Sequence, residues 1–425
     1  MIKTVSVVGL GYVGLPTAAL IARAGYRVHG VDVNEALVRE LSDGMCRLEE
    51  PDVNELVESV LEAGSLTAST TPGQADLHII CVPTPVDRDG KAELSMVRSA
   101  MKAVAPVVRK GDLVILESTS PIGTTRNVIG GALQAVGLDP EEDVDVCYCP
   151  ERVFPGNTIS EILDNDRVIG GLTRQAALRA QEFYASFCNG NPVLTTASTA
   201  EFSKLMENTY RDVNIALANA FARVAEETDV DVRDVIHLAN MHPRVNVHTP
   251  GAGVGGHCIP VDPKFLIEAF PEATQLLAIA RDINDTQAVR MVDRAEAAGL
   301  KPGSTVAILG AAYRGDIDDA RDTPTEILIK TLGDRGYRWR THDPHVQVFK
   351  MHNEYAPNLT DDLDVALQDA DAAFLMTAHS DYNALTAKDF ESLAKGGIVF
   401  DGPSVMNRDM FANSKVRYMK VGQRD

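Results

Sequence analysis

The segment at residues 253–263, GVGGHCIPVDP, places a histidine, a cysteine and an aspartate among glycines and prolines. Cys258 could be a metal ligand, a small buried residue or a nucleophile. A metal site is disfavoured, because His257 is directly adjacent and no other Cys or His stands at the short spacing typical of metal ligands. Burial is a common fate of a cysteine, but glycines let a backbone approach a ligand and prolines stiffen a loop. The residues alone leave a structural cysteine and a nucleophile open.

Lys204, Asn208 and Arg211 form a second group, spaced so that a helix would place them on one face. A lysine and an asparagine one turn apart can stabilise a developing oxyanion, and the lysine can also exchange a proton with the reacting group. A polar stripe facing solvent would show the same spacing. The pattern makes Lys204 and Asn208 catalytic candidates without deciding between the two interpretations.

The segment GLGYVG, Gly9 to Gly14, has the spacing of a dinucleotide-binding turn and directly follows an apolar run. Its glycines permit close approach of the backbone to a pyrophosphate at the start of a helix. Asp32 stands eighteen residues after Gly14, where an acidic side chain binds a ribose hydroxyl and favours NAD over NADP. Such a turn can serve packing alone, but the combination predicts NAD binding. Thr84 and Thr119 follow two further apolar runs and are candidate cofactor contacts.

Apolar runs and helical patterns alternate along the chain. Strands are predicted in TVSVVG, YRVHGVD, ADLHIICVP, GDLVILES and DVDVCYCPE, with a helix over residues 15–25 between the first two. This order predicts a doubly wound parallel sheet in residues 1–195. The alternation returns in residues 301–425, with strands in TVAILG, RWRTHDP, ADAAFLMT and GGIVFDG and a helix in TPTEILIKTLGDRG. The predicted fold class is α/β, with two Rossmann-like domains joined by a helical central domain, residues 196–300.

The central domain begins with a long segment that contains neither glycine nor proline and runs past Glu227. Ser198 and Glu201 have the spacing of a capping box, and about thirty helical residues would span about 45 Å. A helix of this length suits a spine between domains, a subunit interface or the core of a domain, and the pattern leaves these open. Its apolar residues recur at steps of three and four, and include Phe202, Leu205, Val213, Leu217, Phe221 and Val224.

The chain has 425 residues and a formal net charge of -20, with a pI near 4.9. This acidity argues against nucleic acid as a partner, and it means that a phosphate-containing ligand needs local arginines, lysines and helix N-termini. Six cysteines at irregular spacing indicate a reduced, cytoplasmic protein. No segment is long and apolar enough to predict a membrane span.

Seven segments occur in the order found in the UDP-glucose/GDP-mannose dehydrogenase family: GLGYVGLP, VPTP, ESTSPIGTT, CPERVFPG, KLMENTYRDVNIA, HPRVN and GVGGHCIPVDP. The chain resembles this family along nearly its whole length. CPERVFPG, NDRVIGG and HPRVN are most similar to the branch that oxidises UDP-N-acetyl-D-mannosamine, and the branches for UDP-N-acetylglucosamine and UDP-glucose are alternatives. The glucose branch differs in carrying a glutamate in place of Pro155 and a lysine in place of Val261. Members typically also carry lysine in place of Arg314.

The resemblance implies a four-electron oxidation of a sugar C6 alcohol to a carboxylate, which consumes two NAD+ per substrate and needs no metal. Cys258 is similar to the family's nucleophile, which holds the substrate first as a thiohemiacetal and then as a thioester. Lys204 and Asn208 resemble its proton-transferring and oxyanion-stabilising pair. Asp262 resembles a carboxylate that assists water or tunes the lysine, and Glu151 a base in thioester hydrolysis. The implied catalytic residues are Cys258, Lys204, Asn208, Asp262, Glu151 and Thr119.

The same resemblance implies the ligand contacts and a homodimer or higher homo-oligomer, in which Arg244 reaches across a subunit boundary. The implied cofactor contacts are Gly9, Gly11, Tyr12, Val13, Gly14, Asp32, Thr84, Thr119 and Arg321. The implied contacts with a UDP-sugar are Arg152, Val153, Lys204, Asn208, Arg211, His242, Arg244, Gly255 and Arg314. Arginine pairs with phosphate through two parallel hydrogen bonds, which explains how an acidic chain can hold a nucleotide.

Overall fold

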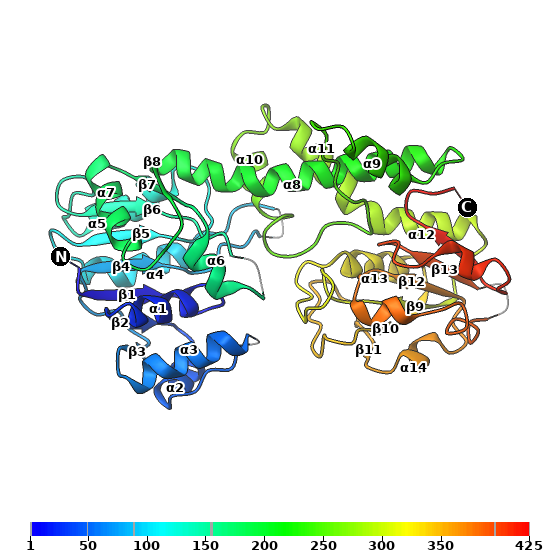
Figure 1. Cartoon of the computed structure of the whole chain (residues 1–425), viewed down its shortest axis with the longest axis horizontal. Coiled ribbons are helices and arrows are strands. Elements are labelled where there is room, and N and C mark those ends of the chain that lie inside the picture. Colours follow the sequence, from blue (N-terminus) through cyan, green and yellow to red (C-terminus); the bar gives the residue numbers. More distant parts are fainter. Residues whose placement is uncertain (1, 49, 88–89, 154–155, 395–396, 425) are drawn as a thin grey trace. The chain divides into compact units, whose positions relative to one another are not determined.

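The computed structural model describes the chain except for residues 1, 49, 88–89, 154–155, 395–396 and 425 (Figure 1). Pro155, one of the family differences, therefore lies outside the described residues. The chain divides into two compact units, residues 1–207 with 264–269 and residues 208–263 with 270–425. Each unit contains one sheet, which confirms the α/β class with two Rossmann-like sheets and a helical middle. The predicted division into three domains, residues 1–195, 196–300 and 301–425, stays a prediction beside this division.

The sheet of the first unit has eight strands in the order β3-β2-β1-β4-β5-β6-β7-β8. Its strands pair in parallel except β6 and β7, which run antiparallel, whereas the sequence predicted parallel pairing only. The order reverses between β1 and β4, and ligands of such sheets bind at this switch point, beyond the carboxyl ends of the strands. The strands are β1 (Thr4–Val8), β2 (Arg27–Val31), β3 (Leu66–Ser69), β4 (Leu77–Ile80), β5 (Leu113–Leu116), β6 (Asp145–Tyr148), β7 (Arg167–Gly171) and β8 (Pro192–Thr196).

Helices cover both faces of this sheet, because its central strands are apolar on both sides. Ile79 and Ile115 pack in one buried cluster with residues of α1, whereas Ile80 and Leu116 pack in another with residues of α4. The helices are α1 (Gly14–Arg23), α2 (Glu35–Ser42), α3 (Pro51–Glu62), α4 (Ser95–Val104), α5 (Gly131–Ala135), α6 (Thr158–Asp164) and α7 (Arg174–Tyr184), with a short 3-10 helix η1 (Ala105–Val107) and a π-helix η2 (Thr125–Gly130).

The sheet of the second unit has six strands in the order β11-β10-β9-β12-β13-β14, and all its pairs are parallel. Its order also reverses next to its first strand, between β9 and β12, so this unit has a second switch point. The elements are β9 (Thr305–Leu309), α13 (Pro324–Asp334), β10 (Arg338–His342), β11 (Leu359–Thr360), α14 (Leu363–Leu367), β12 (Ala372–Leu375), η3 (Ser380–Ala384), β13 (Ile398–Asp401), η4 (Arg408–Phe411) and β14 (Arg417–Lys420).

The helical middle contains α8 (Ala197–Glu226), α9 (Val232–Asn240), α10 (Asp262–Ala269), α11 (Gln275–Asp285) and α12 (Gln287–Ala297) (Figure 1). The thirty residues of α8 confirm the predicted long helix. The predicted capping box is wrong, because the buried Glu201 carboxylate accepts the N–H groups of Gly123 at 2.5 Å and Thr125 at 2.7 Å. At the start of the helix, the Thr196 hydroxyl instead accepts the N–H of Thr199 at 3.3 Å.

A buried ionic network joins α8 to α11 in the second unit. Asp212 on α8 is fully buried and accepts from Arg281 Nη1 at 2.5 Å and from Asn284 Nδ2 at 2.8 Å. Burial raises the pKa of the Asp212 carboxyl, although Arg281 and Asn284 act against this rise. Asn284 also accepts from Asn219, whose side-chain oxygen accepts the N–H of Gly251 at 2.9 Å. The network therefore anchors the loop that leads to Cys258.

Replacing Asp212 with alanine is expected to lower the free energy of unfolding by about 3–5 kcal/mol, because the buried Arg281 loses the one of its two carboxylate partners that is fully buried. Asp285 also pairs with Arg281 but its side chain is partly exposed, so Asp285→Ala is the matched control and should cost less than about 1 kcal/mol. Urea unfolding followed by circular dichroism compares the two variants. An equal decrease of the free energy of unfolding in the two variants would contradict the expectation that the buried carboxylate contributes more than the partly exposed one.

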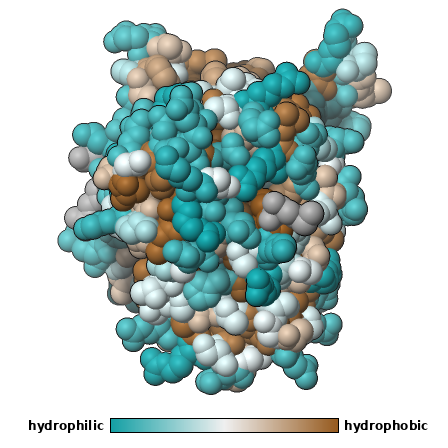
Figure 2. Space-filling model, turned by 90° about the vertical axis from the view of Figure 1, so that its left-hand side faces the viewer, coloured by the Kyte–Doolittle hydropathy of each residue, from teal (hydrophilic) through white to brown (hydrophobic). Residues whose placement is uncertain are grey.

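The surface is mixed rather than uniformly polar. On the face shown in Figure 2, hydrophilic residues cover most of the area, with hydrophobic residues scattered between them. Among the described residues, no helix combines the length and the apolar character that crossing a membrane requires.

Candidate active site

The glycine turn after β1 is built for close packing at two positions and is open at a third. Gly9 has a φ of +94°, and a Cβ there would lie 2.7 Å from the carbonyl oxygen of Cys81. A Cβ on Gly14 would lie 1.9 Å from the carbonyl oxygen of Gly9. A Cβ on Gly11 would meet no atom of the described chain within 4 Å. Gly9 and Gly14 therefore shape the turn, whereas Gly11 leaves room for a pyrophosphate to approach the backbone.

Asp32 lies directly after β2 and is fixed beside this turn. Its Oδ2 accepts the N–H of Leu10 at 2.8 Å, and its Oδ1 accepts the N–H of Asn34 at 2.9 Å. A carboxylate has about four lone-pair sites, so acceptor capacity remains for the hydroxyls of a ribose. The open turn and the fixed carboxylate both fit NAD.

Two threonines predicted as cofactor contacts lie after neighbouring strands of the sheet. The Thr84 hydroxyl, after β4, donates to the carbonyl oxygen of Thr119, after β5. Tyr12, in the glycine turn, bonds through its hydroxyl to Glu50 and, at 2.6 Å, to Thr158 Oγ1. The structure thus holds Thr84 and Thr119 together and gives Tyr12 a partner, Glu50, that sequence reasoning missed. No local spacing could have indicated that pair.

Replacing Gly14 with alanine is expected to cost about 3 kcal/mol or more of stability, because the new methyl group would overlap the Gly9 carbonyl. Gly11→Ala makes the same chemical change in open space, so we expect unchanged thermal unfolding but NAD binding weaker by roughly tenfold. Calorimetric titration with NAD+ and thermal melts separate the two effects. Equal melting temperatures for the two variants would contradict this assignment of the glycines.

The Lys204 amino group is buried against the loop that follows β6. Its Nζ donates to the Glu151 carbonyl oxygen at 2.6 Å and lies 3.4 Å from Glu151 Oε1. The other carboxylate oxygen, Oε2, accepts the N–H of Val153 at 2.7 Å. A pocket beside this pair is lined by Val13, Glu117, Glu151, Arg152 and Val153 together with residues of α6. The structure therefore brings Lys204, Glu151, Val153 and Val13 together.

Arg152, predicted to contact the UDP-sugar, is held by the same helix that carries Lys204. Its guanidinium donates through two nitrogens to the Glu207 carboxylate and through Nη1 to the carbonyl oxygen of Asp166 at 2.9 Å. Glu207 was missed by sequence reasoning, although its place three residues after Lys204 could have indicated it. Its pairing fixes the orientation of the Arg152 side chain.

Cys258 lies on a turn that is tied to α8 through Asp262. Asn208 Nδ2 donates to Asp262 Oδ2 at 2.6 Å, and both side chains are buried although they lie fifty-four residues apart in sequence. The N–H of Asp262 donates to the Cys258 carbonyl oxygen at 2.9 Å. The half-buried Cys258 Sγ lies 3.0 Å from His257 Nδ1. The structure therefore brings Asn208 and Asp262 together at the turn that carries Cys258, with an imidazole beside the thiol.

The glycines next to Cys258 pack closely against protein. A Cβ on Gly255 would lie 2.8 Å from Tyr313 Cβ, and a Cβ on Gly256, whose φ is +89°, would lie 2.9 Å from the Tyr313 ring. Tyr313 therefore leaves no space for a Cβ at either position, and the predicted contact of Gly255 with the UDP-sugar stays a prediction. Burial is the main cause that raises the pKa of Tyr313. Tyr313 belongs to the segment AAYRGD, and its role against the cysteine loop was missed.

The segment after β9 carries two arginines that were predicted to contact ligands. Arg321, predicted to contact NAD, donates to the Asp319 carboxylate at 2.6–3.0 Å, and its carbonyl oxygen accepts the N–H of Gly256 at 3.2 Å. Arg314, predicted to contact the UDP-sugar, is half-buried. The segment that carries both is thus linked to the cysteine loop.

Three other predicted contacts are exposed in the second unit. Arg211 lies on α8, and His242 and Arg244 lie after α9. The N–H of Arg244 donates to His242 Nδ1 at 3.3 Å. Their side chains are accessible, and a role in ligand binding stays a prediction.

Three family models match successive segments of the chain: the NAD binding domain over residues 3–188, the central domain over 198–286 and the UDP binding domain over 307–408. The chain belongs to the UDP-glucose/GDP-mannose dehydrogenase family. It is an NAD-dependent nucleotide-sugar oxidoreductase, which confirms the resemblance seen in its motifs.

Relatives extend this match over nearly the whole chain. A UDP-N-acetyl-D-mannosamine dehydrogenase of Methanocaldococcus jannaschii is 39% identical over 426 residues, covering 99% of this chain and 96% of the relative. An NDP-N-acetyl-D-galactosaminuronic acid dehydrogenase of Ralstonia solanacearum is 38% identical, covering 92% and 94%. The solved structure of a UDP-D-ManNAc dehydrogenase from Pyrococcus horikoshii matches with a TM-score of 0.90 at 36% identity, covering 99% of each chain.

Proposed function

We propose that this chain oxidises the C6 alcohol of UDP-N-acetyl-D-mannosamine to the carboxylate, giving UDP-N-acetylmannosaminuronate. The observation that carries the proposal is the Cys258 thiol on a turn whose Asp262 is locked to Asn208. The names of the full-length relatives support the choice of sugar. NAD+, when bound, accepts one hydride in each of two successive oxidations.

Lys204 is the proposed base of the first oxidation. As a neutral amine it takes the proton of the C6 hydroxyl while a hydride leaves C6, and the alcohol becomes an aldehyde. Its burial and its contacts with Glu151 fix the position of Nζ, so the proton is exchanged at a defined place.

Cys258 makes the second oxidation possible, because an aldehyde has no hydride to lose until a nucleophile adds to it. The thiolate sulfur bonds to C6 and the carbonyl oxygen becomes an oxyanion, giving a thiohemiacetal. Loss of hydride from C6 then converts this adduct into a thioester. Asn208 has a second amide hydrogen beyond the one given to Asp262, and that hydrogen can stabilise the oxyanion.

Water then cleaves the thioester, so that the carbon–sulfur bond breaks and the thiolate returns. Overall, R–CH2OH, two NAD+ and water give R–COO−, two NADH and three H+. Glu151 and Asp262 are the two candidates to take the proton from water. Glu151 is hydrogen-bonded to Lys204, and Asp262 is hydrogen-bonded to Asn208, so the two carboxylates can be tested separately.

In the variant that lacks the water-activating carboxylate, the thioester is expected to accumulate. Glu151→Gln and Asp262→Asn keep the size and one hydrogen-bonding oxygen of each side chain, so each is the control of the other. Mass spectrometry of acid-quenched enzyme should find the sugar nucleotide attached to Cys258 in one variant only, with acid release slowed by about 10²–10⁴-fold. Accumulation in neither variant would exclude both carboxylates.

The identity of the sugar is tested with UDP-N-acetylmannosamine, UDP-N-acetylglucosamine, UDP-N-acetylgalactosamine and UDP-glucose. UDP-N-acetylglucosamine and UDP-glucose are the alternatives suggested by the motifs, and the Ralstonia relative favours inclusion of the galactosamine sugar. We expect the highest kcat/KM for UDP-N-acetylmannosamine, with two NADH per sugar. A higher kcat/KM for another sugar would identify that sugar as the substrate instead. One NADH per sugar would contradict the four-electron oxidation.

An exposed apolar stripe on α8 supports a homo-oligomer. Large exposed apolar patches are rare on monomers and mark interfaces. Analytical ultracentrifugation should therefore find at least a dimer, and a monomer at micromolar concentration would contradict this. The exposed residues are Phe202, Met206, Tyr210, Leu217, Phe221 and Val224.

A further inference from the structure

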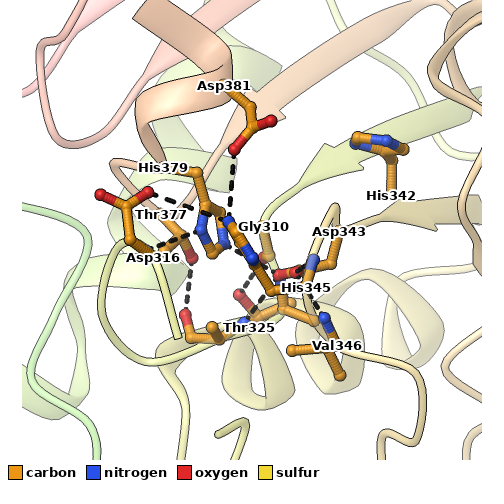
Figure 3. Close-up of polar contacts among 12 residues, drawn as sticks. Gly310, Asp316, Thr325, His342, Asp343, His345, Val346, Thr377, His379 and Asp381 are labelled. Atoms are coloured by element: carbon orange, nitrogen blue, oxygen red, sulfur yellow. Dashed lines mark hydrogen bonds and ion pairs between the residues drawn. The ribbon is translucent and has the colours of Figure 1, made fainter. Parts of the chain in front are cut away.

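Three loops at the carboxyl edge of the second sheet bring histidines and aspartates together (Figure 3). Asp316 lies in the segment after β9, His345 follows β10 and His379 follows β12. One potential ligand atom of each residue lies within 4.8 Å of those of the other two. The proposed reaction uses none of these residues.

His345 Nε2 is held between two carboxylates. It lies 3.2 Å from Asp381 Oδ2 and 3.9 Å from Asp316 Oδ1, and Figure 3 draws both contacts. The Nε2 atom is buried and makes no hydrogen bond to any described residue. In a tetrahedral zinc site with bonds of 2.0–2.1 Å, neighbouring ligand atoms are about 3.3 Å apart. The distance to Asp381 is close to this value, and the distance to Asp316 is about 0.6 Å longer.

The His379 ring is oriented by a buried carboxylate in the way that metal-binding histidines are. Its Nε2 donates to Asp343 Oδ2 at 3.0 Å, and both side chains are fully buried or nearly so. The lone pair is then on Nδ1, which accepts the N–H of Asp316 at 3.0 Å. Asp343 itself is fixed by four backbone N–H groups, those of Ala311, Ala312, His345 and Val346.

We propose that Asp316, His345 and His379 bind a divalent transition metal of the zinc class, with Asp381 as a fourth ligand. Zinc and the neighbouring divalent transition metals accept imidazole nitrogens and carboxylate oxygens as ligands, whereas calcium and magnesium require shells of oxygen atoms. The Asp343 carboxylate behind His379 is the outer partner that fixes the tautomer of a zinc-binding histidine. Metal binding exchanges the Asp316 N–H···Nδ1 hydrogen bond for a bond from Nδ1 to the metal.

Such a metal would join the three loops to one another. Asp316 is two residues after Arg314 and three after Tyr313, which packs against the glycines next to Cys258. A bound ion is therefore expected to stiffen the segment that carries the predicted UDP-sugar contact. Because the ion binds the folded chain, it also raises the melting temperature, and the rise grows with the logarithm of the free ion concentration above the Kd.

The test is a calorimetric titration of the full chain with Zn2+, after removal of any affinity tag and of bound metal by a chelator. No sugar nucleotide is present, so failure here is independent of the proposed oxidation. We expect one Zn2+ per chain, and in His345→Gln an affinity lower by about tenfold or more. The matched control is His352→Gln, because His352 also pairs with one carboxylate, Glu326 at 3.3 Å, but has no third ligand nearby among the described residues.

Wild-type affinity in His345→Gln, or the same loss in His352→Gln, would overturn the proposal. Asp316→Asn provides a second variant at an exposed side chain, in case His345→Gln folds poorly, and it should weaken binding similarly. Co2+ substitution gives a spectroscopic check, because nitrogen and oxygen ligands produce visible d–d bands without the near-ultraviolet band of a thiolate. A thiolate band that disappears in Cys258→Ser would instead place the metal at Cys258.

Discussion

Replacing Cys258 with serine is expected to slow acid formation by a factor on the order of 10³ or more. A serine hydroxyl is not ionised near neutral pH, so it adds to the aldehyde poorly and the thioester route is lost. In the proposed mechanism, the first oxidation does not need the thiol. The variant should therefore form at most one NADH per sugar, with the aldehyde as the product. Counting NADH with limiting sugar, together with mass spectrometry of the product, measures both quantities.

Cys188→Ser is the matched control for this substitution. Cys188 is half-buried like Cys258, and its Sγ donates to the Ile162 carbonyl oxygen, a bond that a hydroxyl can also make. Its activity should stay within about twofold of wild type. Iodoacetamide should modify Cys258 selectively and more slowly when the sugar nucleotide is present. If Cys258→Ser still formed two NADH per sugar, Cys258 would not be the nucleophile of the reaction.

The fold was largely predictable because its strands are local apolar runs. Strands at residues 4–9, 26–32 and 305–310 were predicted from such runs, and β1, β2 and β9 lie within them. The direction of a strand relative to its neighbour depends on tertiary structure, so the antiparallel pairing of β6 with β7 was missed. The capping box failed for a similar reason. Glu201 has the right spacing, but Gly123 and Thr125, far away in the sequence, take its carboxylate into the core.

The residues of the candidate site could be predicted where they belong to a local sequence motif. Helical spacing places Lys204 and Asn208 one turn apart, but it does not show which loops meet them. The contacts of Lys204 with Glu151 and of Asn208 with Asp262 each cross more than fifty residues. The same limit explains Tyr313, because glycine spacing indicates a close approach without naming the group that comes close. Long-range pairing was therefore supplied by the structure alone.

Replacing Lys204 with methionine is expected to lower kcat by about 10²–10⁴-fold, because the proposed proton acceptor is lost from a buried position. The methionine side chain has a similar length but carries no amino group. Lys204→Arg should not restore activity, since arginine does not release its proton in proteins and its planar group fits the space of an ammonium poorly. The loss should fall on the first hydride transfer. Single-turnover absorbance at the NADH band, with both variants at saturating NAD+, measures it.

The matched control is Lys330→Met, because Lys330 also pairs with a carboxylate, Asp334, but on an exposed face of α13. Exposed pairs contribute little, so its kcat should change by less than about twofold. The two site variants then differ in a way that a general loss of structure would not produce. Lys204→Met should slow even the first NADH, whereas Cys258→Ser should form the first NADH and stop. If Lys204→Met forms the first NADH at the wild-type rate, another group accepts the first proton. Lys204 would then only hold the loop of Glu151 in place.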